Sequence, residues 1–185
     1  MEENRKKINQ LLGLANSIIL GKDRALKLCL CTILAKGHLL IEDVPGVGKT
    51  TVVYFWAKVL GLPVNRIQLT SDLLPADIIG NLIYDKEKGK FEIYKGPIFT
   101  NLVLADELNR ATPKTQSAFL QAMEEGAVSI DNQILELPKP FVVFATQNPK
   151  QQIGTFLLPE SQLDRFLMKI QIGFPEEKFE KELLA

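Results

Sequence analysis

The chain has 185 residues, 46% of them hydrophobic and 24% charged, and its 22 basic and 22 acidic side chains leave a formal net charge of zero. This composition is typical of one folded domain and excludes an intrinsically disordered chain. The neutral total lacks the basic excess of a protein that depends on nucleic-acid phosphates. No apolar stretch reaches the ~20 residues of a membrane span, and the N-terminus has no secretory signal, so we expect a soluble cytoplasmic protein without nucleic-acid partners.

The apolar pattern predicts an α/β fold. Apolar residues recur at helical spacing over residues 8–19 and 26–34, and a further helix is expected over 51–60. Short apolar runs typical of buried parallel strands occur at residues 39–42, 64–69, 102–105, 141–145 and 166–172. The segments between these runs are long enough to cross over a sheet. We therefore expect a central parallel sheet with helices on both faces.

Two polar segments interrupt this alternation and predict hairpins that project from the body. One joins residues 81–85 to 90–95, and the other joins 127–130 to 134–137. At the end of the chain, residues 176–184 predict the beginning of a charged amphipathic helix that is cut short. We expect residues 1–175 to form the core domain and 176–185 to begin another helix or a linker.

The cysteines and the histidine give no sign of a metal site. Cys29 and Cys31 are two apart in a predicted helix and therefore point in different directions. We expect reduced thiols that pack as small apolar groups. His38, the single histidine, has no second His or Cys nearby, so a zinc site is not expected.

A glycine-rich loop lies between a predicted strand and a predicted helix, which is typical of phosphate binding. Glycines let backbone N–H groups converge on phosphates, and the helix that follows adds its positive N-terminal end. Lys49 is placed to neutralise the β- and γ-phosphates, and the Thr50 hydroxyl to bind Mg²⁺. The candidate nucleotide-binding segment is Val44, Pro45, Gly46, Val47, Gly48, Lys49, Thr50 and Thr51.

Asp43 departs from the usual phosphate-loop pattern. In G-x-x-x-x-G-K-[ST] the first glycine falls where this chain has Asp43. A carboxylate facing the phosphates would repel them. We therefore expect Asp43 to point away from the loop or to be paired.

Two carboxylates end the third apolar run. Asp106 and Glu107 follow residues 102–105, and the carboxyl ends of parallel strands meet at one edge of a sheet. They are therefore predicted to lie at the same edge as the glycine loop. Asp106 is suited to hold the Mg²⁺ shell and Glu107 to polarise an attacking water.

Three segments together resemble the MoxR family of AAA+ ATPases: residues 42–50, 104–117 and 145–149. The resemblance extends from about residue 21 to residue 175. It implies an AAA+ P-loop core, with residues 72–97 as the helix 2 insert and 127–137 as the pre-sensor 1 hairpin. It also implies ATP and Mg²⁺ as ligands, a ring, most often a hexamer, and protein clients such as von Willebrand factor A domain proteins.

The resemblance also implies roles for single residues. Asn148 matches the sensor 1 residue, whose amide can contact both the γ-phosphate and the attacking water. Arg165 matches the arginine finger that reaches a neighbouring subunit's nucleotide, and Arg110 is a second candidate for that contact. Gly21 matches the place where the adenine is held. The family's helical lid, with its sensor 2 arginine, is missing from this sequence, so we expect the chain to be a core subdomain or a fragment.

Other functions remain open at this stage. Besides an ATP hydrolase, the chain could be a nucleotide-binding regulatory or scaffold module with little turnover. An MCM-like DNA motor would need a basic hairpin tip, whereas this turn reads Asp131-Asn132-Gln133. A GTPase would need Lys-x-Asp for guanine, whereas Asn148 is followed by Pro149.

Overall fold

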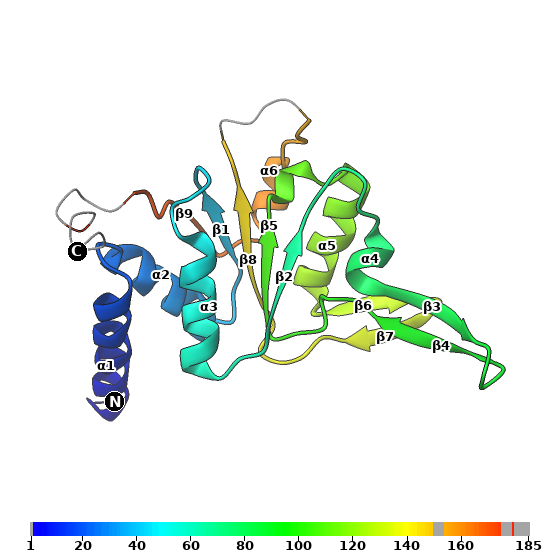
Figure 1. The fold of residues 1–185 in the computed structure, drawn as a ribbon, viewed down its shortest axis with the longest axis horizontal. Helices are drawn as coiled ribbons and strands as arrows, with labels where there is room; N and C mark the ends of the chain where they lie inside the picture. The colour runs from blue at the N-terminus through cyan, green and yellow to red at the C-terminus, as the bar shows by residue number, and fades with distance from the viewer. Residues whose placement is uncertain (1, 150–153, 175–178, 180–185) are drawn as a thin grey trace.

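The computed structural model of the protein describes residues 2–149, 154–174 and 179. Five parallel strands form its central sheet in the order β2-β5-β8-β1-β9 (Figure 1). These strands are β1 (Leu39–Glu42), β2 (Val64–Gln68), β5 (Leu102–Asp106), β8 (Val142–Gln147) and β9 (Met168–Ile170). The predicted parallel sheet is confirmed.

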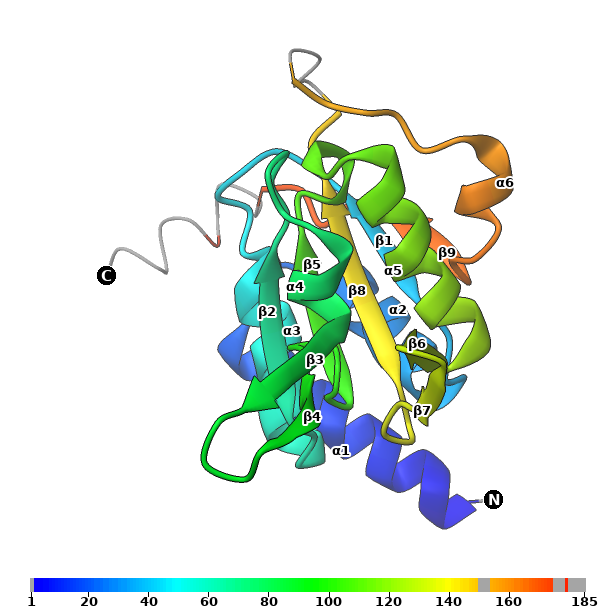
Figure 2. The same ribbon diagram turned by 90° about the vertical axis from the view of Figure 1, so that its right-hand side faces the viewer.

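Helices cover both faces of the sheet (Figure 2). On one face lie α1 (Glu2–Ile18), α2 (Asp23–Leu34) and α3 (Lys49–Leu60), and on the other lies α5 (Pro113–Glu125) with the short α4 (Pro75–Ile79) and α6 (Glu160–Leu163). Successive strand residues point to opposite faces, so Leu102 and Leu104 join the first core, and Val103 and Ala105 the second. Both faces are buried, which is why the strands read as continuous apolar runs.

A 3₁₀ turn, η1 (Leu108–Arg110), and helix α5 continue the chain directly after β5. Pro113 stands in the first turn of α5, and the Thr112 hydroxyl accepts a hydrogen bond from the Thr115 amide at 3.3 Å. Gly126 ends the helix in the left-handed conformation, with φ 62°. These end signals fix the position of α5 against the sheet close to the end of β5.

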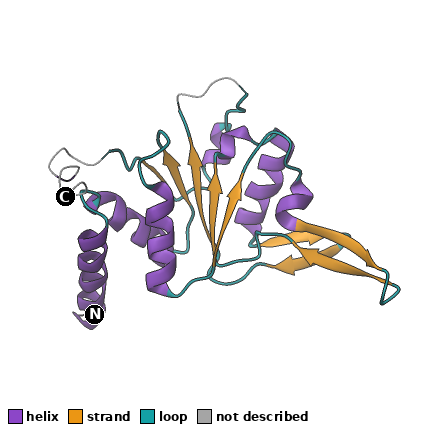
Figure 3. Ribbon diagram, viewed as in Figure 1, coloured by secondary structure: helices purple, strands orange, loops and turns teal. Residues whose placement is uncertain are grey.

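Both predicted hairpins are present, with bounds shifted by one residue at three strand ends (Figure 3). They are β3 (Gly80–Asp85) with β4 (Lys90–Lys95), and β6 (Ala127–Ile130) with β7 (Gln133–Glu136). The first hairpin requires glycines at its base. A Cβ on Gly80 would lie 2.2 Å from the Tyr94 carbonyl oxygen, and one on Gly96 would lie 2.2 Å from the Ile78 carbonyl oxygen.

The last predicted strand, residues 166–172, is too long: β9 covers only Met168–Ile170. The Ile172 amide leaves the sheet because it donates to a side chain, the Asp43 carboxylate, at 2.8 Å. The predicted helix at 176–184 lies outside the described residues except for Phe179. The ring of Phe179 lies beside Gly21, where an added Cβ would approach it to 2.6 Å.

His38 belongs to the core, as a neutral imidazole. Its Nδ1 accepts from the Val143 amide at 3.0 Å, so its Nε2 is the nitrogen that donates to the Met123 carbonyl at 3.1 Å. Burial lowers the pKa of this histidine below its usual 6.5. In the part of the chain that the structure describes, no cluster of three or more His, Cys, Asp or Glu residues could hold a metal, and Cys29 and Cys31 are both free thiols.

The burial of His38 makes the stability of the protein depend on pH. Below about pH 6.5 the unfolded chain takes up a proton that the folded imidazole resists, so the free energy of unfolding should fall as the pH drops through the folded-state pKa. Urea unfolding at about pH 7.5 and about pH 5.5 should show a larger loss for the parent protein than for His38→Gln. An equal loss of unfolding free energy in the parent protein and in His38→Gln would show that His38 does not cause this pH dependence.

Candidate nucleotide site

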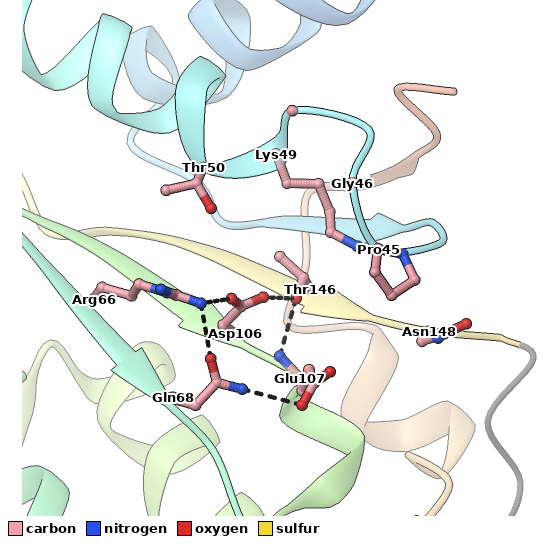
Figure 4. Close-up of a pocket in the computed structure, with 11 residues that line it drawn as sticks. Pro45, Gly46, Lys49, Thr50, Arg66, Gln68, Asp106, Glu107, Thr146 and Asn148 are labelled. Atoms are coloured by element: carbon pink, nitrogen blue, oxygen red, sulfur yellow. Dashed lines mark hydrogen bonds and ion pairs between the residues drawn. The ribbon is translucent and has the colours of Figure 1, made fainter. Parts of the chain in front are cut away.

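A cavity of about 410 Å³ lies at the carboxyl edge of the sheet, between the loop after β1 and the ends of β2, β5 and β8 (Figure 4). This is the edge where open parallel sheets bind ligands. Its lining residues are Pro45, Gly46, Gly48, Lys49, Thr50, Arg66, Gln68, Asp106, Glu107, Thr146 and Asn148. Residues from four separate parts of the sequence therefore meet in one place.

The glycine loop forms one wall of this cavity. Gly46 has φ 88° and Gly48 has φ 87°, a left-handed conformation that residues with a Cβ rarely adopt. An added Cβ would meet no atom within 4 Å at either glycine, so the backbone angle is what requires glycine there. Helix α3 begins directly after Gly48, and its N-terminal end provides amide donors and a positive potential for an anion.

Lys49 lies in the first turn of α3 with its amine folded back onto the loop. Its Nζ donates to the carbonyls of Asp43 at 2.8 Å and Val44 at 3.1 Å. Burial lowers the pKa of Lys49, while the nearby carboxylates of Asp106, Asp43 and Glu107 act in the opposite direction. The loop therefore holds a cation at the mouth of the cavity.

Asp43 is paired, as the sequence predicts. Its side chain is 9% exposed, and its Oδ2 accepts from the amides of Ile172 at 2.8 Å and Gly173 at 2.6 Å. Its Oδ1 accepts from the Val44 amide at 3.0 Å. The carboxylate is therefore turned toward the segment after β9 and is absent from the cavity lining.

Asp106 and Glu107 lie at the end of β5, as predicted, and both side chains line the cavity. Asp106 accepts from the Thr146 hydroxyl at 2.6 Å through Oδ1 and pairs with Arg66 at 2.6 Å through Oδ2. Glu107 accepts through Oε2 from Gln68 at 3.0 Å and from Arg110 at 3.0 Å. Figure 4 shows the carboxylates on neighbouring parts of the cavity floor.

The backbone of Glu107 is left-handed, with φ 58°, which is uncommon for a residue other than glycine. Its amide donates to the Thr146 hydroxyl at 2.9 Å. Thr146 therefore joins the two acidic residues, because the same oxygen donates to Asp106. Such backbone strain is concentrated at functional sites, where the surrounding structure holds it in place.

Asn148 follows β8 and also lines the cavity, 7% exposed. Lys49, Thr50, Asp106, Glu107 and Asn148, which the sequence assigns to phosphate binding, metal binding and water activation, thus surround a common space.

Comparison with known proteins identifies the family. Residues 38–168 match the model of the ATPase family associated with various cellular activities (AAA), a span that contains every residue lining the cavity. The chain belongs to this family.

Its relatives place it in the MoxR branch of these AAA ATPases. It is 47% identical over 167 residues to Chaperone MoxR1 of Mycobacterium tuberculosis, which covers 90% of this chain and 44% of that protein. It is 50% identical over 182 residues to YeaC of Bacillus subtilis, covering 96% of this chain and 57% of that protein. A crystal structure from Cytophaga hutchinsonii superposes with a TM-score of 0.87 at 44% identity, over 97% of this chain and 55% of that one.

The chain therefore spans about half the length of the relatives it matches. The MoxR and AAA assignments predicted from sequence are confirmed, as is the α/β P-loop fold. The matched family is described as a family of ATPases. No helix within the described ranges is long and apolar enough to cross a membrane.

Some residues predicted for the MoxR-type site lie outside the cavity lining. Val47 is buried in the core, Thr51 is exposed on α3, and Val44 contributes a carbonyl to Lys49. Gly21 lies by Phe179. None of these four residues lines the space beside Asp106 and Glu107.

Arg165 lies beyond α6 and is separate from the cavity of its own subunit. Its guanidinium pairs with Glu124 of α5 at 2.5 Å and donates to the Ser161 carbonyl at 3.2 Å. The side chain is 31% exposed. This position is compatible with the predicted contact to a neighbouring subunit, because an arginine acting between subunits need not reach its own cavity.

The sequence reasoning missed Arg66, Gln68 and Thr146. In β2 the exposed Arg66 and Gln68 flank the buried Ile67, so both polar side chains point to the same side. This alternation was the available signal, because three of the six residues in the run predicted at 64–69 are polar. Thr146 gave no comparable signal, because a threonine at the end of a buried strand is common.

The donor set of the cavity fits Mg²⁺. The Asp106 carboxylate and the Thr50 hydroxyl are hard oxygen donors that line the same space. Mg²⁺ is usually held by one or two carboxylates together with substrate phosphates and water rather than by a protein cage.

Proposed function

We propose that this chain binds ATP together with Mg²⁺ and hydrolyses the γ-phosphate, and that hydrolysis drives chaperone-like remodelling or assembly of partner proteins. The observation that carries the proposal is the cavity in which Lys49, Thr50, Asp106, Glu107 and Asn148 come together. A module that only bound nucleotide would need the loop and its lysine. Glu107 and Asn148 are the additional groups that hydrolysis requires.

Binding begins at the glycine loop and the N-terminal end of α3. The amides there donate to the phosphate oxygens, and the Lys49 amine exchanges its carbonyl partners for the β- and γ-phosphates. Thr50 and Asp106 would hold Mg²⁺, which neutralises charge that develops on the phosphate oxygens. Asp43 stays turned away, because its carboxylate is already satisfied by three backbone amides.

Hydrolysis needs a water in line with the bond that breaks. Glu107 accepts a hydrogen bond from this water, and Asn148 donates to the γ-phosphate while accepting from the same water. The water oxygen forms a bond to the γ-phosphorus and gives a proton to the Glu107 carboxylate as the bond to the β-phosphate oxygen breaks, giving ADP and phosphate. Release of phosphate in the presence of Mg²⁺, and its loss in EDTA, tests this step.

The assembly we propose is a homo-oligomeric ring, a hexamer in keeping with the family resemblance, with proteins as clients. Proteins with von Willebrand factor A domains are the partner class that the resemblance suggests. The support within this chain is the position of Arg165, away from its own cavity and on an accessible part of the surface. In the ring, Arg165 would contact the nucleotide of the adjacent subunit.

Mixing two inactive variants tests whether Arg165 acts between subunits. Arg165→Ala should bind ATP but lose about 10³-fold or more in turnover, the usual effect of removing an arginine finger. Lys49→Ala subunits bind ATP weakly but still carry Arg165. If the arginine acts between subunits, mixing the two variants restores part of the phosphate release. Activity that stays at zero in every mixture would contradict action between subunits.

A further inference from the structure

Arg66 contributes a second cation to the phosphate cavity. It lies on β2, the edge strand of the sheet, and its guanidinium reaches the Asp106 carboxylate at 2.6 Å. The same nitrogen donates to the Gln68 side-chain oxygen at 2.9 Å, which fixes the orientation of the guanidinium. Figure 4 shows the Arg66 side chain pointing toward Asp106, the residue proposed to hold the metal.

Both oxygens of Asp106 are already engaged. Oδ1 accepts from the Thr146 hydroxyl and Oδ2 pairs with Arg66. The Asp106 side chain is 14% exposed, whereas Arg66 is 47% exposed, so the acid is fixed and the cation can leave toward solvent. A divalent cation that binds Asp106 would repel a guanidinium 2.6 Å from the same carboxylate.

Lys49, the other positive side chain in the lining, does not pair with Asp106. Among the described residues that line the cavity, Lys49 and Arg66 are the cations, and Lys49 donates to the carbonyls of Asp43 and Val44. Arg110 pairs with Glu107. Each of the two cavity carboxylates therefore has its own arginine partner, and Asp106 is partnered by Arg66.

We infer that Arg66 is a positioning residue that neutralises Asp106 while no metal is bound and competes with the metal for that carboxylate. Arg66 thereby sets how strongly nucleotide binding depends on Mg²⁺. This inference rests on the proposed nucleotide site. In the metal-free protein Arg66 lessens the repulsion between Asp106 and the phosphates. Once a metal binds, the metal neutralises Asp106 in place of Arg66.

Metal-coupled nucleotide binding tests the inference. The dissociation constant of a fluorescent, non-hydrolysable ATP analogue is measured in EDTA and in saturating Mg²⁺. The value in EDTA divided by the value in Mg²⁺ gives the coupling between metal and nucleotide binding. Arg66→Gln should raise this ratio by about two- to five-fold, the range expected from losing a partly exposed ion pair. Arg66→Lys, which keeps the charge, should remain near the parent ratio. Arg5→Gln, an equal change on the exposed face of α1, is the control.

The Asp106→Asn background separates this role from direct phosphate contact. If Arg66 acts through Asp106, Arg66→Gln changes the ratio much less in that background. An equal rise in both backgrounds, or an unchanged ratio in the single variant while the parent protein binds the analogue, would overturn the inference. Failure of the folded parent protein to bind the analogue at all would instead remove the proposed nucleotide site on which the inference rests.

Discussion

Lys49→Ala should weaken ATP binding by about 10- to 150-fold, because the phosphates lose a charged hydrogen-bond donor worth about 1.5–3 kcal/mol. The backbone amides of the loop and the N-terminal end of α3 remain, so residual binding at high ATP concentration is expected. Isothermal titration calorimetry with ATP and Mg²⁺ measures the change directly.

Lys58→Ala is the matched control for this prediction. Lys58 lies in the last turn of the same helix, α3, and is exposed. It should bind ATP as tightly as the parent protein. Unchanged affinity in Lys49→Ala, with the thermal midpoint of the parent protein, would remove Lys49 from the phosphate site.

Glu107→Gln should retain ATP binding and lose about 10²- to 10⁴-fold in turnover, the usual contribution of a general base. Glutamine has the same shape and can still accept from Arg110, but its amide cannot take up a proton from water. The left-handed backbone of residue 107 should tolerate glutamine as well as glutamate, since both residues have the same Cβ.

Single-turnover phosphate release, together with the calorimetric affinity, separates chemistry from binding in Glu107→Gln. Glu87→Gln, in the exposed turn between β3 and β4, is the control and should behave as the parent protein. If Glu107→Gln released phosphate at the parent rate, another group would have to activate the water.

The strands of the sheet could be predicted because each is a short run of consecutive apolar residues in the sequence. Residues 102–105 read as a buried strand, since both faces of β5 are covered and each successive side chain must be apolar. The glycine loop was equally predictable, because the left-handed angles at Gly46 and Gly48 require a residue without a Cβ. The place of Asp106 and Glu107 follows from the rule that parallel strands end at one edge.

The contacts within the site could not be predicted, since they depend on side chains distant in sequence. The pairing of Arg66 with Asp106 joins residues 40 apart on neighbouring strands, and its register is a property of the folded sheet. The end of β9 was mispredicted for a similar reason: the Ile172 amide is withdrawn from the sheet by Asp43, 129 residues earlier. The apolar pattern contains no information about that hydrogen bond.

We propose that this cavity hydrolyses ATP with a contribution from a second subunit. Phosphate release per subunit should therefore be measured over a wide range of protein concentration, with Glu107→Gln as the blank. The account predicts a specific activity above the blank that rises with concentration as subunits assemble. ATP binding with phosphate release equal to the blank at every concentration would contradict it, and would indicate a module that binds nucleotide without turning it over.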